Sequence, residues 1–133
     1  MRFGITYDYL CPFARNANEH VVAALRGGAD WDVTFEPYSL TQNKVEDGEP
    51  AVWDRDDALA QSGVLALAVA ELVRARDPER FPDVHVELFA LRHDHGEDLR
   101  DPARVREALG RAGADPALVD DAAAGLPALR DGH

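Results

Sequence analysis

The first 38 residues switch between two periodicities, and this order restricts the fold more than any other feature. Residues 2–7 (RFGITY) and 31–38 (WDVTFEPY) alternate apolar and polar side chains, as strands with one buried face do. The segment between them begins a helix at Pro12, because proline suits the first helical position, and ends at Gly27 and Gly28. The sequence therefore predicts a strand, a right-handed helical crossover and a parallel second strand.

The crossover helix is expected to run from Pro12 to about Arg26 and to bury one apolar side. The positions expected on that side are Ala17, Val21, Ala24 and Leu25.

Periodic segments after the polar loop at 44–50 all have helical spacing. Residues 56–75 are apolar on most sides, which predicts a helix buried between other elements. Residues 83–93, 101–113 and 115–125 carry one apolar side each, and the last two open with Asp-Pro and close at glycine. The apolar positions expected to be buried are Val84, Leu88, Leu91, Val105, Leu109 and Ala112.

Composition indicates a globular protein and argues against two classes of partner. The chain has 133 residues, 46% of them apolar and 29% charged, which suits one folding unit with a substantial core. Its 25 acidic residues against 14 basic ones give a formal net charge of −11, so no nucleic-acid partner is expected. The longest apolar run, residues 63–70, is too short to span a membrane, and no secretory signal is evident, so the cytoplasm is expected.

Cys11 is the only cysteine, so no disulfide can close within the chain. It stands directly before Pro12, at the start of the crossover helix. A thiol in this place lies beside unpaired backbone N–H groups and the positive end of the helix dipole, both of which favour the reactive thiolate. The alternative is a small buried side chain without chemistry, the commoner state of a free cysteine. We favour the reactive thiol because of its position before the proline.

The order of these segments resembles the DsbA-like branch of the thioredoxin superfamily. The resemblance is carried by "DYLCPFA" after the first strand, "FEPYSLTQN" at the end of the second, and the helical stretch "LFALRHDHGEDLRDPARVREALGRAGAD". Relatives of that branch include kappa-class glutathione transferases, 2-hydroxychromene-2-carboxylate isomerases and mycothiol-dependent reductases. The resemblance implies an α/β fold with a thioredoxin-like βαβ start in residues 1–43 and a helical insertion subdomain in 44–133.

Two departures from the family limit what the resemblance implies. Where dithiol members read Cys-x-x-Cys, this chain has Ala14, so exchange between two cysteines of one chain is excluded. The strands that complete the family's sheet after the helical insertion, introduced by a cis-proline, have no counterpart in the sequence. We expect either that the C-terminal strands belong to a longer chain or that a second copy, in a homodimer, completes the sheet, and we favour the first.

The resemblance implies a thiol–disulfide oxidoreductase with Cys11 as a lone nucleophile and a small thiol, glutathione or mycothiol, as its cofactor and partner. Its second substrate would be a disulfide or an electrophile. Two alternatives remain open: a thiol-dependent isomerase or transferase that activates bound glutathione, and a non-catalytic module.

Other residues near the cysteine are assigned by position. Pro12, Phe13 and Ala14 are expected to contact the small thiol or substrate, with Phe13 exposed, and Trp53 is expected to line a cleft between the subdomains. Trp31 is expected in the strand core.

Four polar residues are not expected to take part in the chemistry. Asp8 is expected to be a solvated residue at the strand end. His93 and His95, two residues apart on a helix, point apart and do not indicate a metal site. His20 lies too far along the helix to pair with Cys11.

Overall fold

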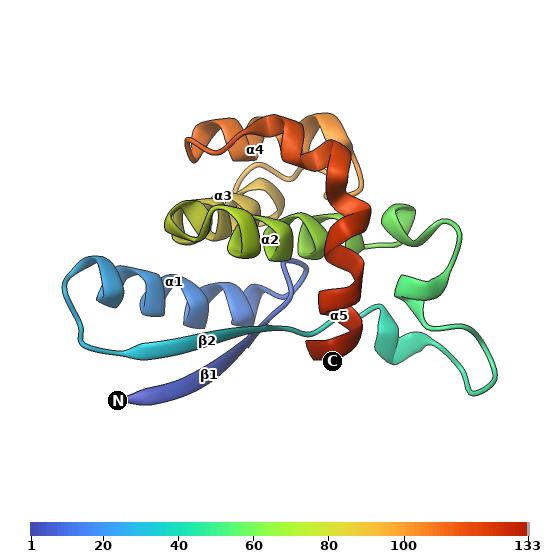
Figure 1. Ribbon diagram of the computed structural model, residues 1–133, viewed down its shortest axis with the longest axis horizontal. Helices are drawn as coiled ribbons and strands as arrows, with labels where there is room; N and C mark the ends of the chain where they lie inside the picture. The colour runs from blue at the N-terminus through green and yellow to red at the C-terminus, as the bar shows by residue number, and fades with distance from the viewer. Residues whose placement is uncertain (133) are drawn as a thin grey trace.

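The predicted βαβ unit is present at the start of the chain. A computed structural model describes residues 1–132; His133, the end of the second predicted segment, lies outside them. Strands β1 (Arg2–Tyr7) and β2 (Asp32–Pro37) are parallel and paired in register along their whole length. Helix α1 (Pro12–Arg26) connects them and lies on one face of this small sheet (Figure 1).

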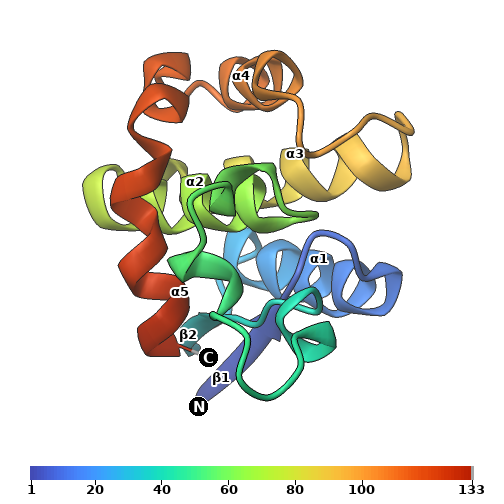
Figure 2. The ribbon, with the colours of Figure 1, turned by 90° about the vertical axis from the view of Figure 1, so that its right-hand side faces the viewer.

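Helices α2, α3 and α4 stack over α1 on the side away from the sheet: Figure 1 shows α2 and α3 above α1, and α4 above them. Figure 2 shows residues 116–132, 3-10 turns followed by α5, running down the side of this stack from the level of α4 to the strands. Their bounds are Val64–Arg76 for α2, Phe81–His93 for α3, Pro102–Arg111 for α4 and Leu126–Gly132 for α5. The chain therefore has the mixed α/β architecture that the sequence predicts.

Most predicted burial is confirmed. Residues 64–73 of α2 are buried on every side, and the apolar positions predicted for α3 and α4 are also buried. Helix α1 differs: Ala17 is exposed, whereas Asn18 and Val22 are buried. Trp31, expected in the strand core, is partly buried just before β2, where its ring packs edge-on against Phe3.

Helix α2 begins later than its apolar pattern predicts. Residues 58–60 form a separate 3-10 turn, and the helix starts at Val64, after Gly63 in a left-handed conformation with φ of 79°. A Cβ atom on Gly63 would stand 2.9 Å from the side chain of Leu10. The loop before Cys11 and the start of α2 are thus in close contact.

The last predicted helix also differs from its prediction. Residues 116–125 form 3-10 turns, and Gly125 is followed directly by α5 instead of ending the helical segment. The reason is packing: a Cβ atom on Gly125 would lie 2.0 Å from the carbonyl oxygen of Ala68. Glycine allows the chain to cross the backbone of α2 closely.

Gly125→Ala is expected to destabilise the protein by about 2 kcal/mol, because the new methyl group meets backbone that cannot move without disturbing α2. Urea unfolding measures the loss. Gly110→Ala, in α4, is the matched control. A Cβ atom on Gly110 would lie 3.9 Å from Pro116, an ordinary contact, and we expect this variant to be neutral or stabilising by about 0.5 kcal/mol. Equal stability of the two variants would contradict this role of Gly125.

One edge of β1 pairs with β2, and no other strand lies beside β1 within residues 1–132. The sheet face away from α1 is polar and exposed, with Thr6, Thr34 and Glu36 on it. No helix in the described part of the chain is long and apolar enough to cross a membrane.

Candidate active site

Cys11 is the N-cap of α1, as the sequence predicts. Its backbone is extended, and its Sγ accepts a hydrogen bond from the N–H of Ala14 at 3.4 Å. The turn is closed on the other side by the N–H of Cys11, which donates to the carbonyl oxygen of Asp8 at 3.0 Å. A thiolate at this place would keep the Ala14 hydrogen bond and lie at the positive end of the 15-residue helix.

The half-buried thiol borders a small cleft of about 90 Å³ between the ends of β1 and β2. The side chains around it include Thr6, Asp8, Ala14, Tyr38 and Leu40. Cys11 and Ala14 are both half-buried and therefore face the same opening.

Of the other predicted contact residues, Pro12 and Phe13 follow Cys11 directly, whereas Trp53 does not line its cleft. Pro12 is exposed beside the thiol, and Phe13 has 82% of its surface exposed, as predicted. Trp53 lies in a short turn, Val52–Asp54, that contacts α5, and it packs partly against the core. It is not among the residues lining the Cys11 cleft.

Asp8 is buried, which corrects the expectation of a solvated residue. Only 3% of its surface is exposed, and its carboxylate accepts hydrogen bonds from the N–H groups of Leu10 at 3.0 Å and Leu40 at 2.7 Å. Burial raises the pKa of Asp8 above its ordinary value, and the two hydrogen bonds act in the opposite direction. Asp8 thus ties the loop after β2 to the turn that carries Cys11.

A buried hydrogen-bonded chain supports the turn from below. Tyr9 Oη lies 2.7 Å from Nδ1 of His85, and Nε2 of His85 lies 2.9 Å from Oδ1 of Asn18. The amide nitrogen of Asn18 donates to the carbonyl oxygens of Thr6 and Ala14. Its oxygen must therefore accept from His85, which leaves Nδ1 of His85 to accept from the Tyr9 hydroxyl.

This arrangement requires an uncharged His85. The side chain is fully buried among aromatic rings, with Phe81 stacked on it at 4.8 Å. Burial, and to a smaller extent the charge of Arg74, lower the pKa of His85 from 6.5 to about 3. The imidazole is neutral at pH 7 and holds β1, α1 and α3 together around the cysteine turn.

This chain of residues was not predicted from the sequence, although the sequence contains a signal for it. Asn18 lies four residues after Ala14 and three before Val21, on the side of α1 that the helical period turns inward. His85 similarly lies midway between Phe81 and Phe89 on α3. A polar residue on an otherwise buried side must have a hydrogen-bonding partner, which identifies both as members of an internal network.

His93 and its neighbour Asp94 make structural contacts. Nε2 of His93 donates to the carbonyl oxygen of Tyr9 at 2.8 Å, and the neighbouring Asp94 forms an ion pair of 2.5 Å with Arg15 of α1. Both contacts fix the end of α3 against the cysteine turn. Within residues 1–132 no group of three or more potential metal-ligating side chains is found.

Comparisons with known proteins identify the fold. No protein-family model and no curated protein matches the chain. Among solved structures, the cytosolic disulfide reductase DsbM from Pseudomonas aeruginosa, solved with GSH, matches at a TM-score of 0.71. The match covers 99% of this chain and 77% of that chain, with 16% sequence identity. The chain has a DsbA-like thioredoxin fold. The fold class predicted from the strand–Cys-Pro–helix junction and the helical stretch is therefore confirmed.

Proposed function

We propose that this protein is a cytoplasmic thiol–disulfide oxidoreductase in which Cys11 is the lone nucleophile and glutathione, or a similar small thiol, completes the reaction. The observation that carries the proposal is the position of Cys11: it caps α1 at the edge of a cleft, within a fold shared with a disulfide reductase. Ala14 occupies the place of the second cysteine of dithiol enzymes.

The reaction takes two exchange steps. The Cys11 thiolate attacks one sulfur of a disulfide, a new S–S bond forms on Cys11, and the other half leaves as a thiolate. A glutathione thiolate then attacks the mixed disulfide. When it attacks the sulfur of a glutathionyl group bound to Cys11, oxidised glutathione forms and the Cys11 thiolate is restored. When the substrate is a mixed disulfide of glutathione, the two steps release the substrate thiol and consume one glutathione. Any other disulfide first exchanges with one glutathione to form such a mixed disulfide, so that its full reduction oxidises two glutathione molecules.

The surroundings of Cys11 support each step. The N–H of Ala14 and the end of α1 stabilise the attacking and the leaving thiolate form of Cys11. The exposed Phe13 ring is placed to contact the group attached to the disulfide. The small side chain of Ala14 leaves the cleft beside the sulfur open for a thiol from solution.

Intact mass spectrometry after incubation with oxidised glutathione tests the proposal. We expect the folded protein to gain the mass of one glutathionyl group within minutes and to lose it when reduced glutathione is added. Peptide mapping should place the adduct on Cys11.

Two outcomes would contradict the proposal. Absence of any adduct on protein whose circular dichroism shows a folded chain would mean that Cys11 does not exchange. Tight binding of reduced glutathione without an adduct would instead favour an enzyme that activates the thiol of glutathione for transfer or isomerisation.

A further inference from the structure

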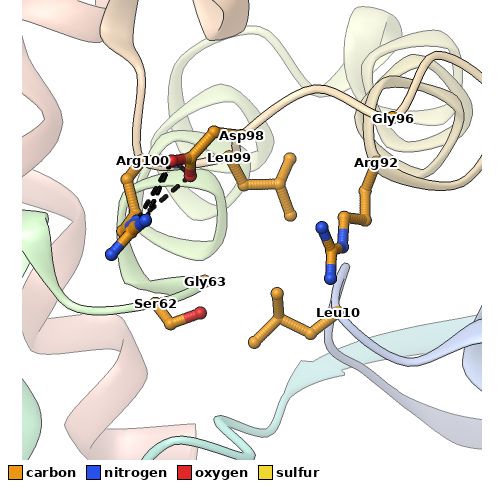
Figure 3. A pocket seen from close by; sticks show the side chains of 8 residues that line it. All are labelled: Leu10, Ser62, Gly63, Arg92, Gly96, Asp98, Leu99 and Arg100. Carbon is orange, nitrogen blue, oxygen red and sulfur yellow. Dashed lines mark hydrogen bonds and ion pairs between the residues drawn. The ribbon is translucent and has the colours of Figure 1, made fainter.

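A second and larger cleft opens beside the cysteine turn. Its volume is about 330 Å³, and it lies between the start of α2, the end of α3 and the loop that leads to α4. Figure 3 shows Leu10, the residue before Cys11, pointing into it, with Ser62, Arg92 and the Asp98–Arg100 pair around it. This cleft has no role in the exchange steps described above.

The cleft has an excess of positive charge in an acidic protein. Arg100 is neutralised by Asp98, with which it forms several hydrogen bonds of 2.9–3.3 Å. Arg92 extends from α3 toward Leu10, and no carboxylate of residues 1–132 lies within ion-pair distance of it. Within the same residues, Arg80 is the only other arginine without such a partner.

The dipole of α2 adds to this charge. Gly63, which lines the cleft, is the N-cap of a 13-residue helix, so the positive end of that helix is directed at the cleft. A guanidinium without a carboxylate partner presents a planar pair of donors that fits a carboxylate. The cleft therefore has the chemistry of a site for a small carboxylate.

The wall that carries Arg92 is fixed to the cysteine turn. His93, the next residue, donates to the carbonyl oxygen of Tyr9, and Asp94 pairs with Arg15 of α1. Opposite this wall, Gly63 packs closely against Leu10. Arg92 is thus held next to the loop that carries Cys11 by contacts that do not use its own side chain.

We propose that the Arg92 cleft binds a carboxylate of the small thiol or disulfide that reacts at Cys11. This inference rests on the proposed function and names the part of the molecule that selects an anionic tripeptide thiol. Leu10, which lines the cleft, is bonded directly to Cys11, so their Cα atoms are about 3.8 Å apart. A glutathione attached to Cys11 through its central residue has a carboxylate at each end, and the proposal places one of these carboxylates beside Arg92.

Rates of mixed-disulfide formation with two disulfides test the inference. Oxidised glutathione carries carboxylates, whereas bis(2-hydroxyethyl) disulfide has no charge. We expect Arg92→Gln to lower the second-order rate constant for oxidised glutathione by about two- to fivefold, because a charged contact at an exposed site is lost. The rate constant for the neutral disulfide should stay unchanged, and added salt should reduce the difference between the proteins.

Arg80→Gln is the matched control, because it removes the other unpaired arginine at the opposite end of α3 and should leave both rate constants unchanged. Equal rates of Arg92→Gln and the unaltered protein with oxidised glutathione would overturn the carboxylate site while leaving the oxidoreductase intact. An equal loss with both disulfides would also overturn it, since Arg92 would then act on the thiol. Failure of the unaltered protein to react with either disulfide would overturn the proposed function and, with it, this inference.

Discussion

Replacing Cys11 with serine is expected to reduce glutathione-dependent disulfide reduction to the uncatalysed rate, a loss of at least about a thousandfold. Serine can keep the hydrogen bond from Ala14, but its hydroxyl does not form the mixed disulfide through which exchange proceeds. The measurement is reduction of bis(2-hydroxyethyl) disulfide by glutathione, followed as NADPH consumption by added glutathione reductase.

The Cys11→Ser variant should fold as well as the unaltered protein, because serine is a strong N-cap residue. Thermal unfolding of the two proteins checks this and separates loss of chemistry from loss of structure. A folded Cys11→Ser variant that still catalyses the reaction would show that another group carries it, and would refute the role assigned to Cys11.

Replacing His85 with leucine is expected to lower the free energy of unfolding by about 4 kcal/mol at pH 7. The substitution leaves the Tyr9 hydroxyl and the Asn18 amide oxygen buried without their partner, and each such loss costs about 1–3 kcal/mol. Urea unfolding followed by circular dichroism measures the change. His20→Leu, on the exposed side of α1, is the control and should change stability by less than about 0.5 kcal/mol.

His85 should also make stability depend on pH in a defined direction. Its pKa is about 3 in the folded protein against an ordinary 6.5. Between pH 3 and 6.5 the His85 side chain therefore binds a proton in the unfolded chain but not in the folded protein. The contribution of His85 is therefore complete above pH 6.5 and declines as pH falls toward 3, by up to about 1.4 kcal/mol per pH unit.

Comparison with His85→Leu isolates this contribution, because other groups titrate in both proteins. Asp8 has a raised pKa in the folded state and contributes with the opposite sign, but it does so equally with and without His85. The stability difference between the two proteins should shrink as pH is lowered from 7 to 4.5. A difference that stays constant over that interval would mean that His85 does not titrate on unfolding.

The elements that the sequence predicted well are those set by local rules. Pro12 at the first helical position and Gly28 with φ of 93° mark the two ends of α1. Asp101 caps α4 as predicted, accepting from the N–H of Ala103. Such signals act over three or four residues, so a single sequence contains them.

The differences arise where distant segments decide the outcome. The sequence predicted a helix end at Gly125. In the structure α5 follows it directly, and the glycine lets the chain pass close to the backbone of Ala68 in α2. Asp8 is buried because the loop at Leu40 supplies a donor from 32 residues away, and His85 reaches Asn18 across 67 residues. No sequence pattern indicated Arg92, because its distinguishing property is the absence of a carboxylate partner among residues 1–132, and only the folded structure shows which side chains lie near it.

The sulfur that caps α1 links the redox state of the protein to the stability of that helix. In the reduced protein the Sγ atom of Cys11 accepts the N–H of Ala14 at the positive end of α1, and a thiolate there would also complement that end. In the proposed mixed disulfide the sulfur carries no charge, so this complement is absent. By thermodynamic linkage, any stabilisation that a thiolate gives to α1 is lost when the mixed disulfide forms. This loss makes the mixed disulfide less stable relative to the thiolate form. In the proposed reaction this bias favours release of the intermediate by a thiol from solution, because the 133 residues contain no second cysteine that could displace it.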